Sequence, residues 1–418
     1  MANLNVTQEN LAKGLSIVSR AVATHSPLPV LGNILLSTDE GGRLRLAATN
    51  LELSILCWIG AKIETPLSTT LPAKTLVDLV GTLPEGRIDI GLDAKTQTTR
   101  LSCGRVKANV KGIDAQEFPL IPSADLSRAV EFSAADLRQM IDEVIFAVAT
   151  DQARPILTGA LVKLEGDIVV LVASDGFRLT VRAARLAKPV PSPVALLIPG
   201  RGLNELRRLL ITEEPVFMCL PEGRGQVIFH HDSVELVSQL IDGAFPEYAN
   251  IIPRRYATRA VLKTAEFRKA CKSTDIFARE AAHTARFKVT PGADEKQGRL
   301  TISATAAETG DNVTSLDATV EGEAVETAFN VKYILEALNA ISAEEVALET
   351  TAPNSPGVLK PVGRDDYLCV VMPMQLGGNS AERSASGGGA KAPAVAEPAT
   401  PVSQATPAAS AIPATTAA

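Results

Sequence analysis

Residues 6–22 read VTQENLAKGLSIVSRAV, which is the pattern of an amphipathic helix with a capped start. Thr7 takes the N-cap position and Glu9 lies in the first turn, where the helix dipole favours a carboxylate. The pattern returns as FSAADLRQMIDEVIFAV at 132–148 and as KTAEFRKACKSTDIFAR at 263–279. Each copy begins with Ser or Thr in an N-cap position followed by Asp or Glu, so the chain is predicted to repeat.

A second helix pattern repeats with nearly the same spacing. It reads TTLPAKTLVDLVGTL at 69–83, LLIPGRGLNELRRLL at 196–210 and TAFNVKYILEALNAI at 327–341. Aligning Pro72, Pro199 and Asn330 gives separations of 127 and 131 residues (199 − 72 and 330 − 199). The first helix patterns begin 126 and 131 residues apart (132 − 6 and 263 − 132). Two unrelated patterns that share one period make chance a poor explanation.

The fold predicted from this period is α+β, with three tandem copies of one unit of two helices and many short strands. Strand-like segments at 43–55, 168–181 and 299–312 support it. The expected domains are 1–128, 129–254 and 255–376, with the linkers FPLIP (118–122) and FPEYANIIP (245–253). Residues 377–418 are rich in Ala and Pro and contain no Leu or aromatic residue, so this tail is expected to be disordered.

The composition narrows the class of protein. The 418 residues carry a net charge of −6, and 46% are hydrophobic but only 4% aromatic, so the cores must be aliphatic. The apolar runs are too short to cross a bilayer, and the polar start does not resemble a signal peptide. Five scattered cysteines predict buried thiols in the cytoplasm rather than disulfides or a zinc site.

The sequence offers little chemistry. It contains no phosphate-binding loop, dinucleotide fingerprint or zinc-protease motif, so no cofactor, metal or catalytic residue is expected. Two segments remain unexplained: SDGFRL (174–179) and VVMPMQL (370–376). SDGFRL can be a hairpin turn or one wall of a binding site, and a hydrolase or transferase that uses Asp175 and Arg178 stays open. VVMPMQL can be a buried last strand or an adaptable apolar surface.

Six segments resemble the bacterial DNA polymerase III beta subunit, the replicative sliding clamp. They occur in the family's order and cover essentially all of 1–376: LPVLGNILL (28–36), TTLPAKTL (69–76), SDGFRL (174–179), FPEYANIIP (245–253), FNVKYILEALNA (329–340) and YLCVVMPMQL (367–376). The tail lies outside the resemblance.

The resemblance implies that two chains close head-to-tail into a ring of six clamp domains. Such a homodimer encircles duplex DNA without reading its sequence, which is compatible with a net negative charge. It is a processivity factor and not an enzyme. The implied partners are the replicative DNA polymerase, the clamp loader, and other replication and repair proteins that carry peptides such as Gln-Leu-x-Leu-Phe.

The resemblance also implies a groove for partner peptides between the second and third domains. Phe177 stands where the family often has His, and Asn250 and Gln375 stand where a basic residue is common, which makes the groove more apolar and less charged. The matching positions are Leu157, Ser174, Gly176, Phe177, Arg178, Leu179, Pro246, Asn250, Ile251, Tyr333, Val370, Val371, Met372, Pro373, Met374, Gln375 and Leu376.

DNA-facing positions implied in the same way are Lys74, Arg154 and Arg201, and Ile276 and Phe277 are implied at the subunit interface. A peptide-binding scaffold that never meets DNA stays open as an alternative. The preferred peptide motif, the dimer affinity, the role of the tail and the repair partners also stay open.

Overall fold

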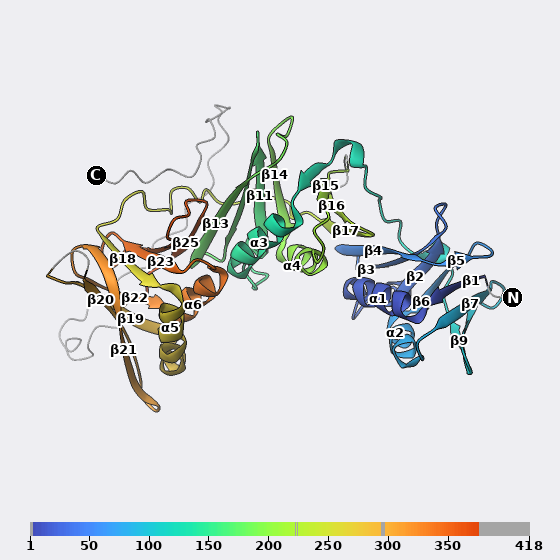
Figure 1. Cartoon of the computed structure of the whole chain (residues 1–418), viewed down its shortest axis with the longest axis horizontal. Helices are drawn as coiled ribbons and strands as arrows, with labels where there is room; N and C mark the ends of the chain where they lie inside the picture. The colour runs from blue at the N-terminus through green and yellow to red at the C-terminus, as the bar shows by residue number, and fades with distance from the viewer. Residues whose placement is uncertain (1–2, 222, 224, 294–296, 376–418) are drawn as a thin grey trace, which may run out of the picture. The chain divides into compact units, whose positions relative to one another are not determined.

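The computed structural model describes residues 3–221, 223, 225–293 and 297–375, which divide into two compact units after Pro246 (Figure 1). The first unit holds two repeats and the second unit holds one. Leu376 and the tail at 377–418 lie outside the described residues, and so does the prediction of disorder made for that tail.

All three repeats follow one order of elements along the described chain: a strand, a helix, four strands, a second helix and three strands, with one additional strand, β5, in the first repeat. The first repeat runs β1 (Leu4–Thr7), α1 (Gln8–Val18), β2 (Asn33–Thr38), β3 (Arg43–Thr49), β4 (Leu53–Gly60), β5 (Lys62–Ile63), β6 (Ser68–Pro72), α2 (Ala73–Thr82), β7 (Arg87–Asp93), β8 (Thr98–Cys103) and β9 (Val106–Lys111). The predicted threefold α+β repeat is thereby confirmed.

The second repeat runs β10 (Val130–Phe132), α3 (Ala134–Val144), β11 (Gly159–Glu165), β12 (Ile168–Ser174), β13 (Arg178–Arg185), β14 (Val194–Pro199), α4 (Gly200–Leu209), β15 (Val216–Cys219), β16 (Gln226–His231) and β17 (Val234–Gln239). The third runs β18 (Thr258–Lys263), α5 (Thr264–Ala278), β19 (Thr284–Pro291), β20 (Gly298–Ala306), β21 (Gly310–Gly322), β22 (Val325–Asn330), α6 (Val331–Ala340), β23 (Glu345–Thr350), β24 (Gly357–Pro361) and β25 (Tyr367–Val371).

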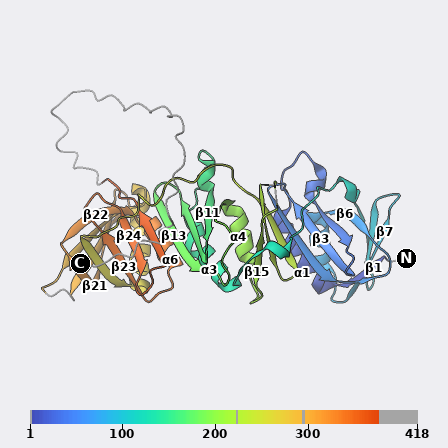
Figure 2. The ribbon, with the colours of Figure 1, turned by 90° about the horizontal axis from the view of Figure 1, so that it is seen from above.

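Each repeat builds the same two antiparallel sheets. The first sheet has the orders β1-β7-β8-β9, β10-β15-β16-β17 and β18-β23-β24-β25 in the three repeats. The second has the orders β4-β3-β2-β6, β13-β12-β11-β14 and β21-β20-β19-β22. The two helices of each repeat pack against each other (Figure 1), and Figure 2 shows the paired strands β23 and β24 side by side.

The first two repeats are joined by a sheet. Strand β17 pairs with β4 in antiparallel register, from Val234 opposite Cys57 to Ser238 opposite Leu53. Helix α1 packs closely on the same sheet because Gly14 has no side chain: a Cβ there would lie 2.7 Å from Leu46 Cδ1. The first two repeats are therefore joined by backbone pairing between strands and not only by the chain segment that links them.

The predicted helix starts are correct for α1 and α3, the first helices of the first two repeats. Thr7 accepts a hydrogen bond from the Asn10 N–H, and Ser133 accepts one from the Asp136 N–H. The prediction is wrong for α5, where Thr264 is the first helical residue and Lys263 occupies the N-cap position without a side-chain cap. Lys263 is the last residue of β18 and pairs with Glu345, just as Thr7 is the last residue of β1 and pairs with Arg87, so the position equivalent to Thr7 is Lys263 and not Thr264.

The three strand-like segments prove to be β-hairpins that occupy the same place in each repeat: β3–β4, β12–β13 and β20–β21. SDGFRL contains the turn of the second hairpin. The segment is thus a hairpin turn.

Candidate functional site

The SDGFRL turn is held together by its own side chains. Asp175 Oδ1 accepts hydrogen bonds from the N–H groups of Phe177 (2.9 Å) and Arg178 (3.0 Å). Ser174 Oγ donates to the Arg178 carbonyl (2.7 Å) and accepts from the Gly176 N–H (3.1 Å). Gly176 has φ +88°, a conformation that glycine adopts without strain. The backbone of the turn is thereby fixed in one shape.

Arg178 points inward and secures this turn from behind. Its side chain is only 7% exposed, and its Nε donates to Asp175 Oδ2 at 3.1 Å. Its Nη2 donates to the Phe146 carbonyl at 2.6 Å, and the guanidinium lies 5.2 Å from the centre of the Phe146 ring. Arg178 therefore positions the turn rather than presenting a charge to a ligand. Asp175 is likewise committed to the turn, so neither residue supports the hydrolase alternative.

Arg154 forms the outer side of the same turn. Its Nη2 donates to the Asp175 carbonyl at 2.7 Å, and its guanidinium lies 6.0 Å from the centre of the Phe177 ring. A Cβ on Gly176 would overlap Arg154 Nη1 in this position, so glycine favours the contact. The resemblance implies that Arg154 faces DNA; the residue is exposed and also contacts the turn.

Phe177 is 56% exposed although it is a large apolar side chain. We call Arg154, Gly176 and Phe177 the turn surface. Leu157 and Leu179, two further predicted groove residues, are buried. An exposed aromatic ring held by a cation on a fixed turn is an arrangement suited to contact with a partner.

The second unit carries the other predicted groove residues. Val370 and Val371 are buried in β25, so their side chains belong to the interior rather than to an exposed surface. Beyond β25 the chain pairs with β22 in an antiparallel bridge between Pro373 and Phe329. The Met374 N–H donates to the Ala328 carbonyl at 2.8 Å. Leu376 lies outside the described residues.

The C-terminal segment thus holds a defined place on the second unit. Met372 is 39% exposed, Gln375 is exposed, and Pro373 and Met374 are half-buried. The other predicted groove positions are Tyr333, half-buried on α6, Asn250 and Ile251, both exposed at the start of this unit, and Pro246, exposed at the end of the first unit.

A basic residue stands at the same place in all three second helices. Lys74 and Arg201 are exposed and occupy the second position of α2 and α4, and Lys332 occupies the second position of α6 and is also exposed. Lys332 is not among the DNA-facing positions that the resemblance implies. It nevertheless follows Asn330 by the same number of residues as Lys74 follows Pro72. A cation in the first turn opposes the helix dipole, typically by about 0.3–1 kcal/mol, so stability does not explain the repetition.

The end of α5 carries the two residues predicted for the subunit interface. Ile276 is 57% exposed, and Phe277 is half-buried. The Thr274 hydroxyl donates to Asn312 Oδ1 at 3.0 Å, which fixes this end of α5 beside strand β21. An exposed isoleucine beside a strand is therefore held in a defined position.

The described residues contain no group of His, Cys, Asp and Glu side chains able to hold a metal ion. The five cysteines are buried and form no disulfide, and burial raises the pKa of both Cys57 and Cys219 to about 11. These two thiols stay protonated at neutral pH and are poor nucleophiles. Within the described part of the chain, no helix is long and apolar enough to cross a membrane.

Three family models together match most of the chain. The N-terminal, central and C-terminal domain models of the DNA polymerase III beta subunit match residues 2–122, 131–247 and 249–375. The beta sliding clamp of Synechococcus elongatus is 32% identical over 372 residues, which cover 88% of this chain and 98% of that protein. That of Caulobacter vibrioides is 30% identical over 379 residues, covering 89% and 100%.

Solved structures agree with these matches. The DNA polymerase sliding clamp of Bacillus subtilis superposes with a TM-score of 0.84 at 26% identity, covering 89% of this chain and 99% of that one. A Pseudomonas aeruginosa sliding clamp bound to griselimycin has a TM-score of 0.82 at 28% identity, covering 90% and 100%. With three matched domain models on three structural repeats, the chain belongs to the DNA polymerase III beta subunit family, the bacterial sliding clamps.

Proposed function

We propose that this chain is the sliding clamp of a bacterial replicase, a ring that encircles duplex DNA in the cytoplasm and tethers the polymerase without catalysing a reaction. The observation that carries the proposal is the agreement of three consecutive family-model matches with three structural repeats. Five buried cysteines without a disulfide are compatible with a reducing compartment.

The proposal that the ring closes is supported by two strand edges that have no partner strand within the described chain. Strand β17 of the second repeat pairs with β4 of the first. The equivalent strands are β9, at the end of the first repeat, and β21, in the third. Strand β9 lies at the edge of its sheet, and residues 310–318 of β21 pair only with β20 among the described strands. We infer that β9 of one chain pairs with β21 of a second chain, which joins two chains head-to-tail.

The function is tested by loading the full-length protein onto circular duplex DNA with a clamp loader and then cutting the DNA once. A closed ring is held by topology, so we expect the protein to stay on the circle in high salt and to leave after linearisation. Gel filtration before and after the cut measures how much protein stays bound to the circular and to the linear DNA. Retention on the linear DNA at the same salt would contradict encirclement, and no retention on the circle would favour the peptide-binding scaffold.

The basic residues at the second position of α2, α4 and α6 supply contacts to the DNA backbone in this proposal. Threefold repetition of a cation where the helix dipole disfavours it is the supporting observation. The helices α1, α3 and α5 carry Glu9, Asp136 and Glu266 in their first turns instead. The three cations are Lys74, Arg201 and Lys332.

Replacing Lys74, Arg201 and Lys332 together by Gln is expected to flatten the salt dependence of DNA binding. Each lost phosphate contact lowers the slope of log K against log salt by about 0.9, so up to about 3 is lost per chain. The measurement is a salt titration of binding to short linear duplex. The matched control replaces Lys62, Lys95 and Arg100 of the first repeat by Gln, because these cations are exposed outside these helices and outside β9; an equal loss there would contradict a specific role.

Partner peptides bind, in this proposal, through the turn surface and the segment from Met372 to Gln375. Phe177 supplies an exposed aromatic anchor, and Met372 is an exposed flexible apolar side chain. Arg178 holds the turn and does not contact the peptide. The Pseudomonas aeruginosa relative with griselimycin bound supports a ligand-binding surface in this family.

A further inference from the structure

The first repeat contains a second turn built like SDGFRL, at the equivalent place in the β3–β4 hairpin. Thr49 Oγ1 accepts a hydrogen bond from the Leu51 N–H at 3.0 Å. Asn50 Oδ1 accepts one from the Glu52 N–H at 3.1 Å and another from the N–H of the next residue at 2.8 Å. The first two residues of SDGFRL make the same bonds. The Gln239 N–H donates to the Glu52 carbonyl at 2.8 Å, which places this turn where the first two repeats join.

The short 3₁₀ helix beside each turn is repeated as well. Pro29–Gly32 in the first repeat corresponds to Pro155–Thr158 in the second. Leu28 and Arg154 precede these helices, and the carbonyl of each accepts a hydrogen bond from the N–H three residues later, at 3.1 and 3.0 Å. Because Arg154 contacts the turn of its repeat, the equivalent Leu28 is placed beside the turn that carries Leu51.

Leu51 is both strained and exposed. Its φ is +77°, in the left-handed region that large side chains disfavour, whereas Gly176 holds the equivalent place with φ +88° and no strain. The Leu51 side chain is 51% exposed, so burial does not offset the strain. A strained backbone that holds an apolar side chain in solvent favours a role in contact with a partner.

Two further leucines are exposed around this turn. Leu28 is one, and Leu120, in the linker FPLIP, is 98% exposed. Phe118 of the linker belongs to the same buried cluster as Leu31, three residues after Leu28, so the linker lies against the 3₁₀ helix. We call Leu28, Leu51 and Leu120 the leucine surface. Single exposed leucines are ordinary, but a group of them indicates contact with another protein.

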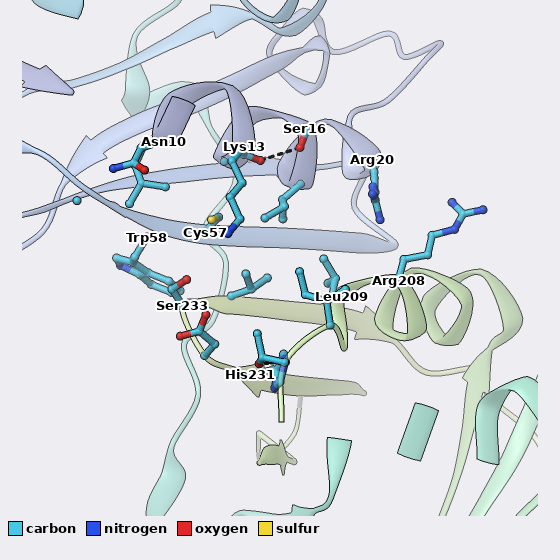
Figure 3. Close-up of a pocket in the computed structure, with 18 residues that line it drawn as sticks. Asn10, Lys13, Ser16, Arg20, Cys57, Trp58, Arg208, Leu209, His231 and Ser233 are labelled. Atoms are coloured by element: carbon cyan, nitrogen blue, oxygen red, sulfur yellow. Dashed lines mark hydrogen bonds between the residues drawn. The ribbon is translucent and has the colours of Figure 1, made fainter. Parts of the chain in front are cut away.

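The segments that form the leucine surface are acidic. Residues 24–34, 46–54 and 112–127 contain four carboxylates and no Lys or Arg. The helix side of the same unit differs, because Lys13 and Arg20 line a cavity of about 410 Å³ there (Figure 3). A partner that docks on the leucine surface is therefore expected to combine apolar and basic side chains. The four acidic residues, all exposed, are Glu52, Asp114, Glu117 and Asp125.

We propose that the leucine surface binds a peptide segment of a partner protein in which leucines are flanked by lysine or arginine. The leucines of the peptide pack on the three leucines of the surface, and its cations pair with Glu52 and Glu117. The occupant differs from that of the turn surface, because Glu52 stands where the second repeat has Phe177, and Leu28 where it has Arg154. The inference rests on the proposed function, since it takes the turn surface as a peptide site, and it adds a second site to the chain.

The probe is a fluorescein-labelled peptide, Lys-Leu-Ala-Leu-Lys, titrated with the full-length protein by fluorescence anisotropy. A saturable rise in anisotropy is expected. The peptide Glu-Leu-Ala-Leu-Glu keeps the leucines but meets the carboxylates with like charge, so it should bind at least about tenfold more weakly. No binding of the basic peptide, or equal binding of the acidic one, would overturn the proposal.

Leu51→Gly is the decisive variant, because glycine adopts this φ without strain and the turn keeps its backbone bonds. Its Tm should stay within about 4 °C of that of the unaltered protein. The Kd for the basic peptide should rise at least about tenfold, and Leu28→Ala should raise it as well. Ile211→Ala, which shortens an exposed side chain of the same unit outside the leucine surface, should leave the Kd unchanged. Unchanged affinity in Leu51→Gly would overturn the site.

Phe177→Ala separates this inference from the proposed function. It should leave the affinity for the basic peptide unchanged while it weakens binding of Gln-Leu-x-Leu-Phe. If Phe177→Ala weakens the basic peptide and Leu51→Gly does not, the peptide lies on the turn surface; the inference is then wrong and the proposed function stands. If the basic peptide requires Leu51 while Gln-Leu-x-Leu-Phe does not bind, the leucine surface stands and the peptide role of the turn surface fails.

Discussion

Replacing Arg178 by alanine is expected to lower the free energy of unfolding by about 3–5 kcal/mol, the usual cost of breaking a buried ion pair from one side. The variant leaves Asp175, whose side chain is 12% exposed, without its charged partner. It also removes the hydrogen bond to the Phe146 carbonyl that ties the turn to the end of α3. Urea denaturation followed by circular dichroism measures the loss.

The same change is expected to abolish peptide binding, because the turn that carries Phe177 loses its support. Phe177→Ala is the matched variant: it alters the exposed ring and leaves the bonds of the turn intact. It should change the free energy of unfolding by less than about 0.5 kcal/mol. Its affinity for a labelled Gln-Leu-x-Leu-Phe peptide should fall about thirtyfold, equivalent to about 2 kcal/mol for an aromatic anchor. Unchanged affinity in Phe177→Ala would exclude the turn surface from the peptide site.

The period of the sequence predicted the fold because helix signals are local. Thr7 and Ser133 cap helices through bonds to residues only three positions away, so their roles can be read without tertiary structure. This reading fails for α5 because the residue that ends the preceding strand, as Thr7 ends β1, is Lys263, while the sequence pattern places the cap one residue later at Thr264. A local pattern locates a helix boundary only to within a residue or two.

The candidate site was less predictable because its contacts join residues that are distant in the sequence. SDGFRL indicated a turn, but the inward direction of Arg178 depends on Phe146, which lies 32 residues earlier. Arg154 reaches the turn across 21 residues, and nothing near it in the sequence indicates that contact. Lys332 was predictable from the sequence. When Pro72, Pro199 and Asn330 are aligned, Lys332 occupies the same aligned position as Lys74 and Arg201.

Replacing Ile276 by aspartate is expected to raise the Kd of the dimer more than about a hundredfold. Ile276 is held beside β21, the strand proposed to pair with β9 of the second chain, so a carboxylate there would be buried without a partner. A cost of about 3 kcal/mol corresponds to that change in Kd. Light scattering over a dilution series measures the mass of the assembly.

Because only a closed ring is retained by topology, loss of the dimer should carry with it the loss of retention on circular DNA. Val362→Asp is the control, since Val362 is 36% exposed in the same unit but follows β24 rather than β21. It should leave both mass and retention unchanged. Peptide affinity should persist in Ile276→Asp, because the turn surface lies within one chain. A dimer as tight as that of the unaltered protein would place the interface away from this end of α5 and would require a different pair of strand edges to close the ring.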